Sequence, residues 1–393
     1  MPADRSYDLV LFGATGFTGG LTARYLARTA PPGLRWAIAG RNRDKLAALR
    51  ADLAADDPAL AELPLVLADS TDPAALARVA AESRVVASTV GPYQRYGEPL
   101  VAACAAAGTD YLDITGEPEF VDDMYLRHHA TAEATGARLV HACGFDSVPH
   151  DLGAYYTVRQ LPRDVPIRLA GYVRVGGRFS AGTYHSALLA ISRQRQTAAV
   201  GRARRRAEPR PADRRVRAVP GRPGRVAEAG WWALPLPTID PQVIRRSAAA
   251  LPAYGPDFTY SHYAAFRRLH MAAATVAGLA GVAGTMRVPP ARDWLLGRMA
   301  AGAGPSAERR ARSWFTVRFV GAGGGRRVVT EVTGGDPGYD ETAKMLGEAA
   351  LCLALDDLPR TAGQVTTAVA MGDALIGRLD RAGIGFRTHQ PAG

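Results

Sequence analysis

Three glycines near the N-terminus have the spacing of a phosphate-binding turn. Gly13, Gly16 and Gly19 stand three residues apart in the stretch FGATGFTGG. Glycine has no Cβ, so the backbone of such a turn can approach a pyrophosphate, whose charge is held by the N–H groups and dipole of the following helix. Because glycines also form ordinary tight turns, this stretch alone leaves dinucleotide binding and a purely structural turn equally favoured.

The second chemical signal is an arginine where a ribose-binding carboxylate is expected. Chains that bind NAD(H) place Asp or Glu roughly 20 residues after the glycines, whereas this chain has Gly40-Arg41-Asn42-Arg43 there. A guanidinium can bind a 2′-phosphate bidentately, and a carboxylate would repel it. The pattern therefore favours NADP(H) over NAD(H). The alternative is that Arg41 and Arg43 lie in water at the end of a strand.

The segments that must position these residues alternate between strands and helices. A buried strand is predicted at 7–12 and a helix at 21–30, and further strand-like segments lie at 35–40, 64–70, 84–93, 110–117 and 137–149. Strands that alternate with helices of this length form parallel βαβ units. Residues 1–150 thus predict an α/β fold with a doubly wound parallel sheet of the Rossmann type, whose ligand lies at the carboxyl ends of the strands.

By that rule, the residues just after each strand should meet in one crevice. They include Thr115-Gly116-Glu117 and Gly144-Phe145-Asp146-Ser147. Tyr93 is expected to stack on or wall the cofactor rather than to act in catalysis. We expect the cofactor to be bound by Gly13, Thr15, Gly16, Phe17, Thr18, Gly19, Arg41, Asn42, Arg43, Asp69, Ser70, Gly91, Pro92 and Tyr93.

The pattern changes after residue 150. Residues 151–340 predict a second, α+β domain, which includes a hairpin across the glycine-rich turn at 321–325. Residues 341–393 contain two amphipathic helical segments, which we expect to pack back on the first domain.

Most of the net charge of +11 lies in one segment, residues 201–227, which holds ten arginines against Glu208 and Asp213. It contains no aromatic residue on which a base could stack, so we do not expect nucleic-acid binding. Its Arg/Pro/Gly-rich composition predicts a flexible, solvated loop. The sharper alternative is a docking strip for an acidic protein or an anionic membrane surface.

The cysteines and the apolar segments bear on the environment of the protein. Cys104, Cys143 and Cys352 are far apart in the sequence, so we expect neither disulfides nor a metal site. This pattern is typical of a protein in the reducing cytoplasm. The N-terminus shows no basic-then-apolar leader. Residues 271–286 are apolar but short, which favours a tightly packed internal helix over peripheral attachment to a membrane. We expect a homodimer only because dimers are the commonest assemblies of soluble proteins.

Several long stretches resemble one family, the saccharopine dehydrogenase-like oxidoreductases, and within it the bacterial trans-acting enoyl reductases. They are FGATGFTGGLTARYL, AGRNRDKL, VGPYQRYGEPLVAACAAAGTDYLDITGE, HACGFDSVPHDLG, GDPGYDETAKMLGEAALCLA and TTAVAMGDALIGRL. The resemblance covers nearly the whole chain. It implies an NADP-binding Rossmann domain with an α+β second domain, and cofactor contacts at Gly13, Gly16, Gly19, Arg41, Asp69 and Gly91-Pro92-Tyr93. His150 stands where the family pattern has a serine.

The reaction that the resemblance favours is NADPH-dependent reduction of an α,β-unsaturated acyl thioester of polyketide or lipid type, either as a small molecule or bound to a carrier. Hydride would reach Cβ, and an acid would protonate Cα. The acid or hydrogen-bond donor is expected among Tyr184, His185, Asp146 and Ser147. Each has a structural alternative, because Asp146 and Ser147 could cap the next helix, and Tyr184 and His185 could lie in a core.

Two other functions stay open at this point. One is oxidoreduction of an imine or amino acid, which would need arginines that face the nicotinamide and bind carboxylates. The other is a non-catalytic NADP(H)-binding adaptor that uses residues 201–227 for contact.

Overall fold

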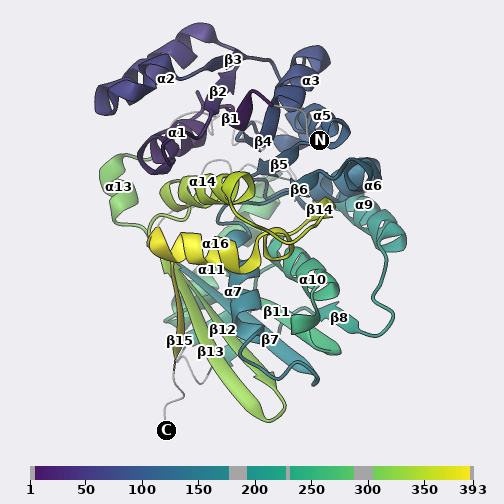
Figure 1. The fold of residues 1–393 in the computed structure, drawn as a ribbon. Coiled ribbons are helices and arrows are strands. Elements are labelled where there is room, and N and C mark those ends of the chain that lie inside the picture. The colour runs from purple at the N-terminus through teal and green to yellow at the C-terminus, as the bar shows by residue number, and fades with distance from the viewer. Residues whose placement is uncertain (1–4, 177–192, 227–230, 287–303, 390–393) are drawn as a thin grey trace.

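Seven parallel strands form the sheet that the alternating pattern predicts (Figure 1). The computed structural model describes residues 5–176, 193–226, 231–286 and 304–389. In spatial order the strands are β3 (Leu65–Leu67), β2 (Trp36–Gly40), β1 (Tyr7–Phe12), β4 (Ser83–Ser88), β5 (Asp110–Asp113), β6 (Arg138–Val140) and β14 (Gly363–Val365). The chain reverses its direction of travel across the sheet between β1 and β4, so the switch point at which such sheets bind ligands lies beside the glycine turn.

The strand sequences explain why helices cover both faces of this sheet. In β1, Leu9 and Leu11 belong to one buried cluster, and Val10 and Phe12 belong to another. A strand that is apolar on both faces is stable only between two layers. The helices of this part are α1 (Phe17–Thr29), α2 (Arg43–Asp56), α3 (Pro73–Glu82), α4 (Tyr93–Tyr96), α5 (Glu98–Ala107) and α6 (Pro118–Thr135), with a 3-10 turn, η1 (Pro58–Glu62).

The boundaries differ from the sequence prediction at two places. Helix α1 begins at Phe17 rather than Leu21, so Gly19 lies inside its first turn. Strand β3 ends at Leu67, which leaves Asp69 and Ser70 in the turn before α3. That turn is stabilised by Asp72, whose carboxylate accepts hydrogen bonds from the N–H groups of Ala74 and Ala75 and so caps α3.

A second, mixed sheet lies below the first in Figure 1. The predicted hairpin is confirmed, and its turn residues Gly324 and Gly325 have φ angles of +58° and +75°, which residues with a Cβ rarely adopt. The strands are β15 (Gly385–His389), β13 (Arg326–Gly334), β12 (Trp314–Gly323), β7 (Ile167–Gly176), β11 (Asp257–Phe266), β10 (Trp231–Pro235) and β9 (Gly224–Val226), with β8 (Arg215–Ala218) paired to β11. The helices of this part are α7 (Val148–Val158), α9 (Gln194–Ala207), α10 (Asp240–Ala250), α11 (Leu269–Met286) and α13 (Ala307–Ala311), with a 3-10 turn, η2 (Pro252–Tyr254).

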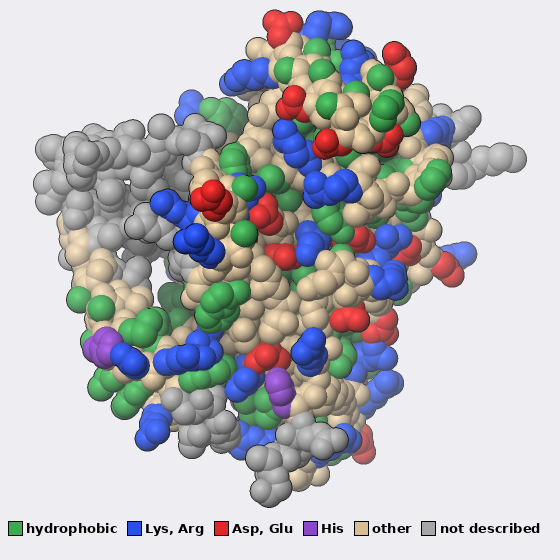
Figure 2. Space-filling model, turned by 90° about the vertical axis from the view of Figure 1, so that its left-hand side faces the viewer, with side chains coloured by type: hydrophobic (Ala, Val, Ile, Leu, Met, Phe, Trp, Pro, Cys, Tyr) green, Lys and Arg blue, Asp and Glu red, His purple; other side chains and the backbone are tan. Residues whose placement is uncertain are grey.

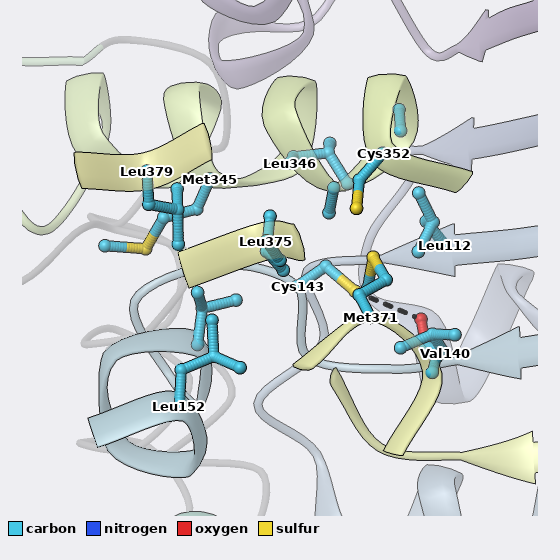
Figure 3. Packing of buried hydrophobic residues seen from close by; sticks show 14 of the residues in the cluster. Leu112, Val140, Cys143, Leu152, Met345, Leu346, Cys352, Met371, Leu375 and Leu379 are labelled. Atoms are coloured by element: carbon cyan, nitrogen blue, oxygen red, sulfur yellow. Dashed lines mark hydrogen bonds between the residues drawn. The ribbon is translucent and has the colours of Figure 1, made fainter. Parts of the chain in front are cut away.

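The C-terminal segment joins the two sheets. Helix α14 (Asp340–Leu355) is buried along most of its length and contacts α1, β1, β4 and β5. Helices α15 (Thr367–Ala370) and α16 (Gly372–Arg381) follow it. Figure 3 shows Met345, Leu346 and Cys352 of α14 packed with Leu375 and Leu379 of α16 and with Leu112, Val140 and Cys143 of the first sheet. The same segment also supplies β14 to the first sheet and β15 to the second, which the sequence prediction of helices alone did not include.

The expectation of a solvated loop at 201–227 is wrong in part, because most arginines of the segment are exposed as predicted but the segment is not a loop throughout. The segment contains the end of α9 and the strands β8 and β9. Arg204 is only 2% exposed, lies over the Tyr125 ring, and donates hydrogen bonds to the Val121 carbonyl and the Glu208 carboxylate. These contacts compensate the guanidinium for lost hydration and fix α9 against α6. Figure 2 shows another face of the molecule, the left-hand side of Figure 1, where basic side chains are interspersed with acidic ones.

The expectation of a tightly packed internal helix at 271–286 is also wrong. Helix α11 covers these residues, but Leu269, Met271 and Val276 are about half exposed (54%, 49% and 51%). Among the described residues, no helix is both long enough and apolar enough to cross a membrane. All three cysteines are free and buried.

Candidate functional site

The three glycines have three different structural roles. Gly13 ends β1 with φ +86°, and a Cβ there would lie 2.6 Å from Val90 Cγ2. A Cβ on Gly19 would overlap the Gly13 carbonyl oxygen, so only glycine lets the first turn of α1 approach the strand. Gly16 is exposed and is the N-cap of α1, and no side chain among the described residues caps the helix by a hydrogen bond. This is the geometry that a pyrophosphate requires.

Residues around the turn keep it in place. Thr89, directly after β4, donates from its hydroxyl to the carbonyls of Phe12 and Gly13 at 3.2 and 3.0 Å. Phe17 is half-buried, and its ring meets the Tyr339 ring edge-on at 4.9 Å. Thr15 is exposed and Thr18 is half-buried at the start of α1. The sequence analysis missed Thr89 because it lies inside the strand-like segment predicted at 84–93, whereas β4 ends at Ser88.

The adenosine end of the crevice carries free positive charge. Arg41 and Arg43 are exposed, and neither forms a direct ion pair with a carboxylate among the described residues. Asn42 instead caps α2, because its side-chain oxygen accepts a hydrogen bond from the Lys45 N–H at 2.9 Å. Asp69 accepts hydrogen bonds from the Thr71 hydroxyl and N–H, which together with the nearby Arg41 lower the pKa of its carboxyl. Ser70 lies beside it, half-buried.

The segment after β4 is held from inside the protein. Tyr93 is buried, and its hydroxyl donates to the Ser88 carbonyl at 3.0 Å, so its ring belongs to the core under the Gly91-Pro92 turn. The N–H groups of Tyr93 and Gln94 donate to the Glu117 carboxylate at 3.2 and 2.8 Å. Glu117 thus fixes this turn relative to β5. The ring of Tyr93, which was expected to stack on or wall the cofactor, is turned away from solvent.

The chain makes a sharp bend after β6. Ala142 has φ +60°, which is uncommon for a residue with a Cβ and is held here by neighbouring bonds. Its N–H donates to Asp113 Oδ1 at 3.1 Å, and Asp113 Oδ2 lies 2.6 Å from Nδ1 of the buried His141. From the other side, Thr342 of α14 accepts a hydrogen bond from the Phe145 N–H at 3.1 Å. These contacts set the direction in which Asp146 projects.

Asp146 is the least restrained acid of this group. A Cβ on Gly116 would lie 2.9 Å from its Oδ2, so the carboxyl reaches over the turn between β5 and α6. The carboxyl is partly buried and has no hydrogen-bond partner among the described residues. Burial and, to a smaller extent, the charge of Asp240 raise its pKa to about 7. At neutral pH a substantial fraction of Asp146 therefore carries a proton that it can donate.

Ser147 and His150 belong to a buried polar cluster behind Asp146. Ser147 is the N-cap residue of α7, but its hydroxyl donates to Asp240 Oδ1 at 3.3 Å instead of capping the helix. His150 Nδ1 lies 3.1 Å from the same oxygen, and burial lowers the pKa of this imidazole to about 4. His262 approaches the other carboxylate oxygen. Tyr184 and His185 lie outside the described residues.

Comparisons with known proteins agree with this geometry. Residues 9–140 match the family model of the saccharopine dehydrogenase NADP binding domain. A relative from Mycobacterium tuberculosis (strain H37Rv), provisionally named as a trans-acting enoyl reductase, is 39% identical over 423 residues and 99% of both chains. A protein of Mycobacterium bovis (strain BCG) named trans-acting enoyl reductase is 37% identical over 414 residues, or 98% of both chains.

A solved structure supports the fold. The apo saccharopine dehydrogenase (L-Glu forming) of Saccharomyces cerevisiae superposes with a TM-score of 0.57 at 13% identity, covering 97% of this chain and 99% of that one. The Rossmann assignment and the preference for NADP(H) are therefore confirmed. This chain belongs to the saccharopine dehydrogenase-like oxidoreductases, in the branch of the trans-acting enoyl reductases, and is an NADP-dependent oxidoreductase.

Proposed function

We propose that the protein reduces the C=C bond of an α,β-unsaturated acyl thioester. The observation that carries this proposal is the near full-length identity with relatives named for enoyl reduction. Asp146, an acid at the carboxyl end of the sheet that has no hydrogen-bond partner among the described residues, supports it.

The residues present fit NADPH along the whole crevice. The open backbone at Gly16 and the N-terminus of α1 suit the pyrophosphate. Arg41 and Arg43, exposed and without a direct ion pair to a carboxylate among the described residues, suit the 2′-phosphate. When bound, the cofactor supplies hydride, and the remaining chemistry falls to groups of the protein.

Asp146 is the proton donor in this proposal. Addition of hydride at Cβ leaves an enolate, whose Cα must gain a proton to give the saturated thioester. The protonated Asp146 carboxyl transfers that proton and becomes a carboxylate, which regains a proton from solvent before the next turnover. A pKa near the working pH balances proton retention against proton release.

The imine or amino-acid dehydrogenase alternative has weaker support. Binding of amino-acid carboxylates needs guanidinium groups that are free to pair with them. The buried arginine of segment 201–227, Arg204, is already bonded within the protein, and Arg217 pairs with Asp257. The non-catalytic adaptor predicts NADPH binding without turnover.

The experiment is a direct comparison of substrates. Purified full-length protein is mixed with NADPH and either 2-enoyl thioesters of several chain lengths or 2-oxo acids with amines. NADPH oxidation is followed by absorbance, and Gly19→Val serves as the variant without a cofactor site. Oxidation with the thioesters supports enoyl reduction. Oxidation only with the oxo acid and amine contradicts it, and tight NADPH binding with no turnover on either class favours the adaptor.

A further inference from the structure

Two imidazoles and a carboxylate meet in the interior behind Asp146. His150 comes from α7, Asp240 is the first residue of α10, and His262 lies in β11. Their exposed fractions are 2%, 3% and 4%. The three potential ligand atoms lie within 4.8 Å of one another. Three elements that are distant in sequence therefore direct nitrogen and oxygen donors at one buried point.

The two imidazoles of this cluster approach the same carboxylate without well-aligned hydrogen bonds. His150 Nδ1 is 3.1 Å from Asp240 Oδ1, and His262 Nε2 is 3.4 Å from Asp240 Oδ2. Yet among the described residues neither nitrogen has a partner in well-aligned hydrogen-bond geometry. An unsatisfied buried polar atom is costly, and two that face one carboxylate call for an explanation. A metal ion held between the two nitrogens and the carboxylate would satisfy all three groups.

The spacing and donor types match a first-row divalent metal. Ligands about 2.0–2.1 Å from a tetrahedral ion lie roughly 3.3 Å from each other. His150 Nδ1 and His262 Nε2 lie 3.1 and 3.4 Å from different oxygens of Asp240, so both carboxylate oxygens face the proposed ion. Imidazole nitrogen with a single carboxylate suits Zn²⁺ or Co²⁺, whereas Mg²⁺ prefers an all-oxygen set.

The surrounding groups resemble the outer shell of a metal site. His262 Nδ1, on the far side of its ring from the cluster, is 2.7 Å from the Tyr260 hydroxyl. The hydroxyls of Ser147 and Thr238 donate to the Asp240 carboxylate, and the Phe145 backbone hydrogen-bonds the His150 ring. Ligating histidines usually bond through their second nitrogen in this way, which fixes the ring orientation, and ligating carboxylates are hydrogen-bonded in turn.

We infer that His150, Asp240 and His262 bind one divalent metal ion of the Zn²⁺ class. The site is closed to solvent, so the ion has a structural role and clamps α7, α10 and β11 together. Because Ser147 bonds to Asp240, the clamp also steadies the loop that carries Asp146. The expectation of no metal rested on the scattered cysteines, which take no part in this cluster.

Metal content of the full chain, produced without a histidine tag, tests this inference. The protein is incubated separately with Zn²⁺, Co²⁺ and Mg²⁺, passed through a desalting column and analysed for metal by mass spectrometry. We expect about one equivalent of Zn²⁺ or Co²⁺ per chain and no retained Mg²⁺. Bound Co²⁺ should also give visible absorption from a site of low coordination number.

Variants on two different elements keep the test independent of folding defects. His262→Gln and His150→Ser should each lose Zn²⁺ retention, whereas His128→Gln, at a histidine paired with Glu98, should retain it. NADPH binding at the distant glycine turn checks that each variant is folded. A strong chelator should lower the melting temperature of the wild type but not that of His262→Gln.

Two results overturn the inference. One is a wild type that retains no Zn²⁺ or Co²⁺ above the Mg²⁺ background. The other is a folded His262→Gln or His150→Ser variant that retains as much Zn²⁺ as the wild type. Neither result depends on turnover, so both are separable from failure of the proposed reaction.

Discussion

The cofactor end and the reactive end of the crevice are built in opposite ways. The glycine turn and Arg41 come from one strand–turn–helix unit and the strand that follows it, with Thr89 and Tyr339 packed against the turn from more distant parts of the chain. Asp146 is oriented by Thr342 of α14 acting on Phe145 and by Asp113 of β5, and it faces Asp240 of α10. Local geometry thus prepares the molecule to bind, and long-range packing prepares it to react. Substitutions should separate these two functions.

The largest expected effect is loss of the cofactor through Gly19→Val. The side chain would collide with the Gly13 carbonyl and push α1 away from β1, so NADPH affinity should fall by at least about 100-fold. Gly20→Ala is the matched control one residue away, because its Cβ meets nothing closer than 3.5 Å. Titration of NADPH fluorescence checks both. Equal affinities for the two variants would contradict the proposed role of the turn.

Asp146→Asn should give the converse phenotype. Asparagine keeps the shape of the side chain but has no acidic proton, so turnover on the enoyl thioester should fall by about 10²–10⁴-fold. NADPH affinity should stay within about twofold of the wild type because the glycine turn is untouched. Single-turnover kinetics with bound NADPH measures the first quantity and fluorescence titration the second. A variant with full turnover removes Asp146 from the reaction.

The contrast also shows how much of the molecule could be predicted from sequence. The alternation of strands and helices, the glycine turn and Arg41 depend on neighbours along the chain, and these predictions correspond to what the structure shows. Arg204 looked solvated because its partners, Asp122 and Gln364, come from α6 and β14. Likewise, nothing near His150 in sequence indicates Asp240 or His262. Contacts of that kind are decided by tertiary packing, which local patterns do not encode.

Arg41→Ala should weaken the binding of one cofactor and spare the other. Loss of a guanidinium that pairs with the 2′-phosphate should reduce NADPH affinity by about 10–100-fold, equivalent to a charged hydrogen bond of about 1.5–3 kcal/mol. NADH has no such phosphate, so its affinity should not fall. Dissociation constants for both cofactors are compared, with the surface variant Arg28→Ala as the control. Equal losses for NADH and NADPH would argue against a phosphate contact.

The pH dependence of stability tests the environment of Asp146. Its folded-state pKa of about 7 lies above the ordinary value of 3.8, so the protonated form is favoured in the folded state. Its contribution to stability is therefore present below about pH 4 and is lost as pH rises toward 7. At pH 8, Asp146→Asn should raise the free energy of unfolding by up to about 4 kcal/mol, and at pH 4 by much less. Denaturant unfolding of chelator-treated protein measures this, since an ion at the His150 cluster would offset the charge of Asp240. A gain that is the same at both pH values would mean that Asp146 is not held protonated by its surroundings.

The measurement that tests the proposed reaction most directly is isotopic labelling of the product. A 2-enoyl thioester is reduced with NADPH carrying deuterium at the transferred position, and in a second experiment with unlabelled NADPH in D₂O. We expect cofactor deuterium at Cβ in the first product and one solvent deuterium at Cα in the second, with formation of both slowed in Asp146→Asn. Absence of thioester reduction under these conditions, or cofactor deuterium at any carbon other than Cβ, would contradict hydride addition followed by protonation from Asp146.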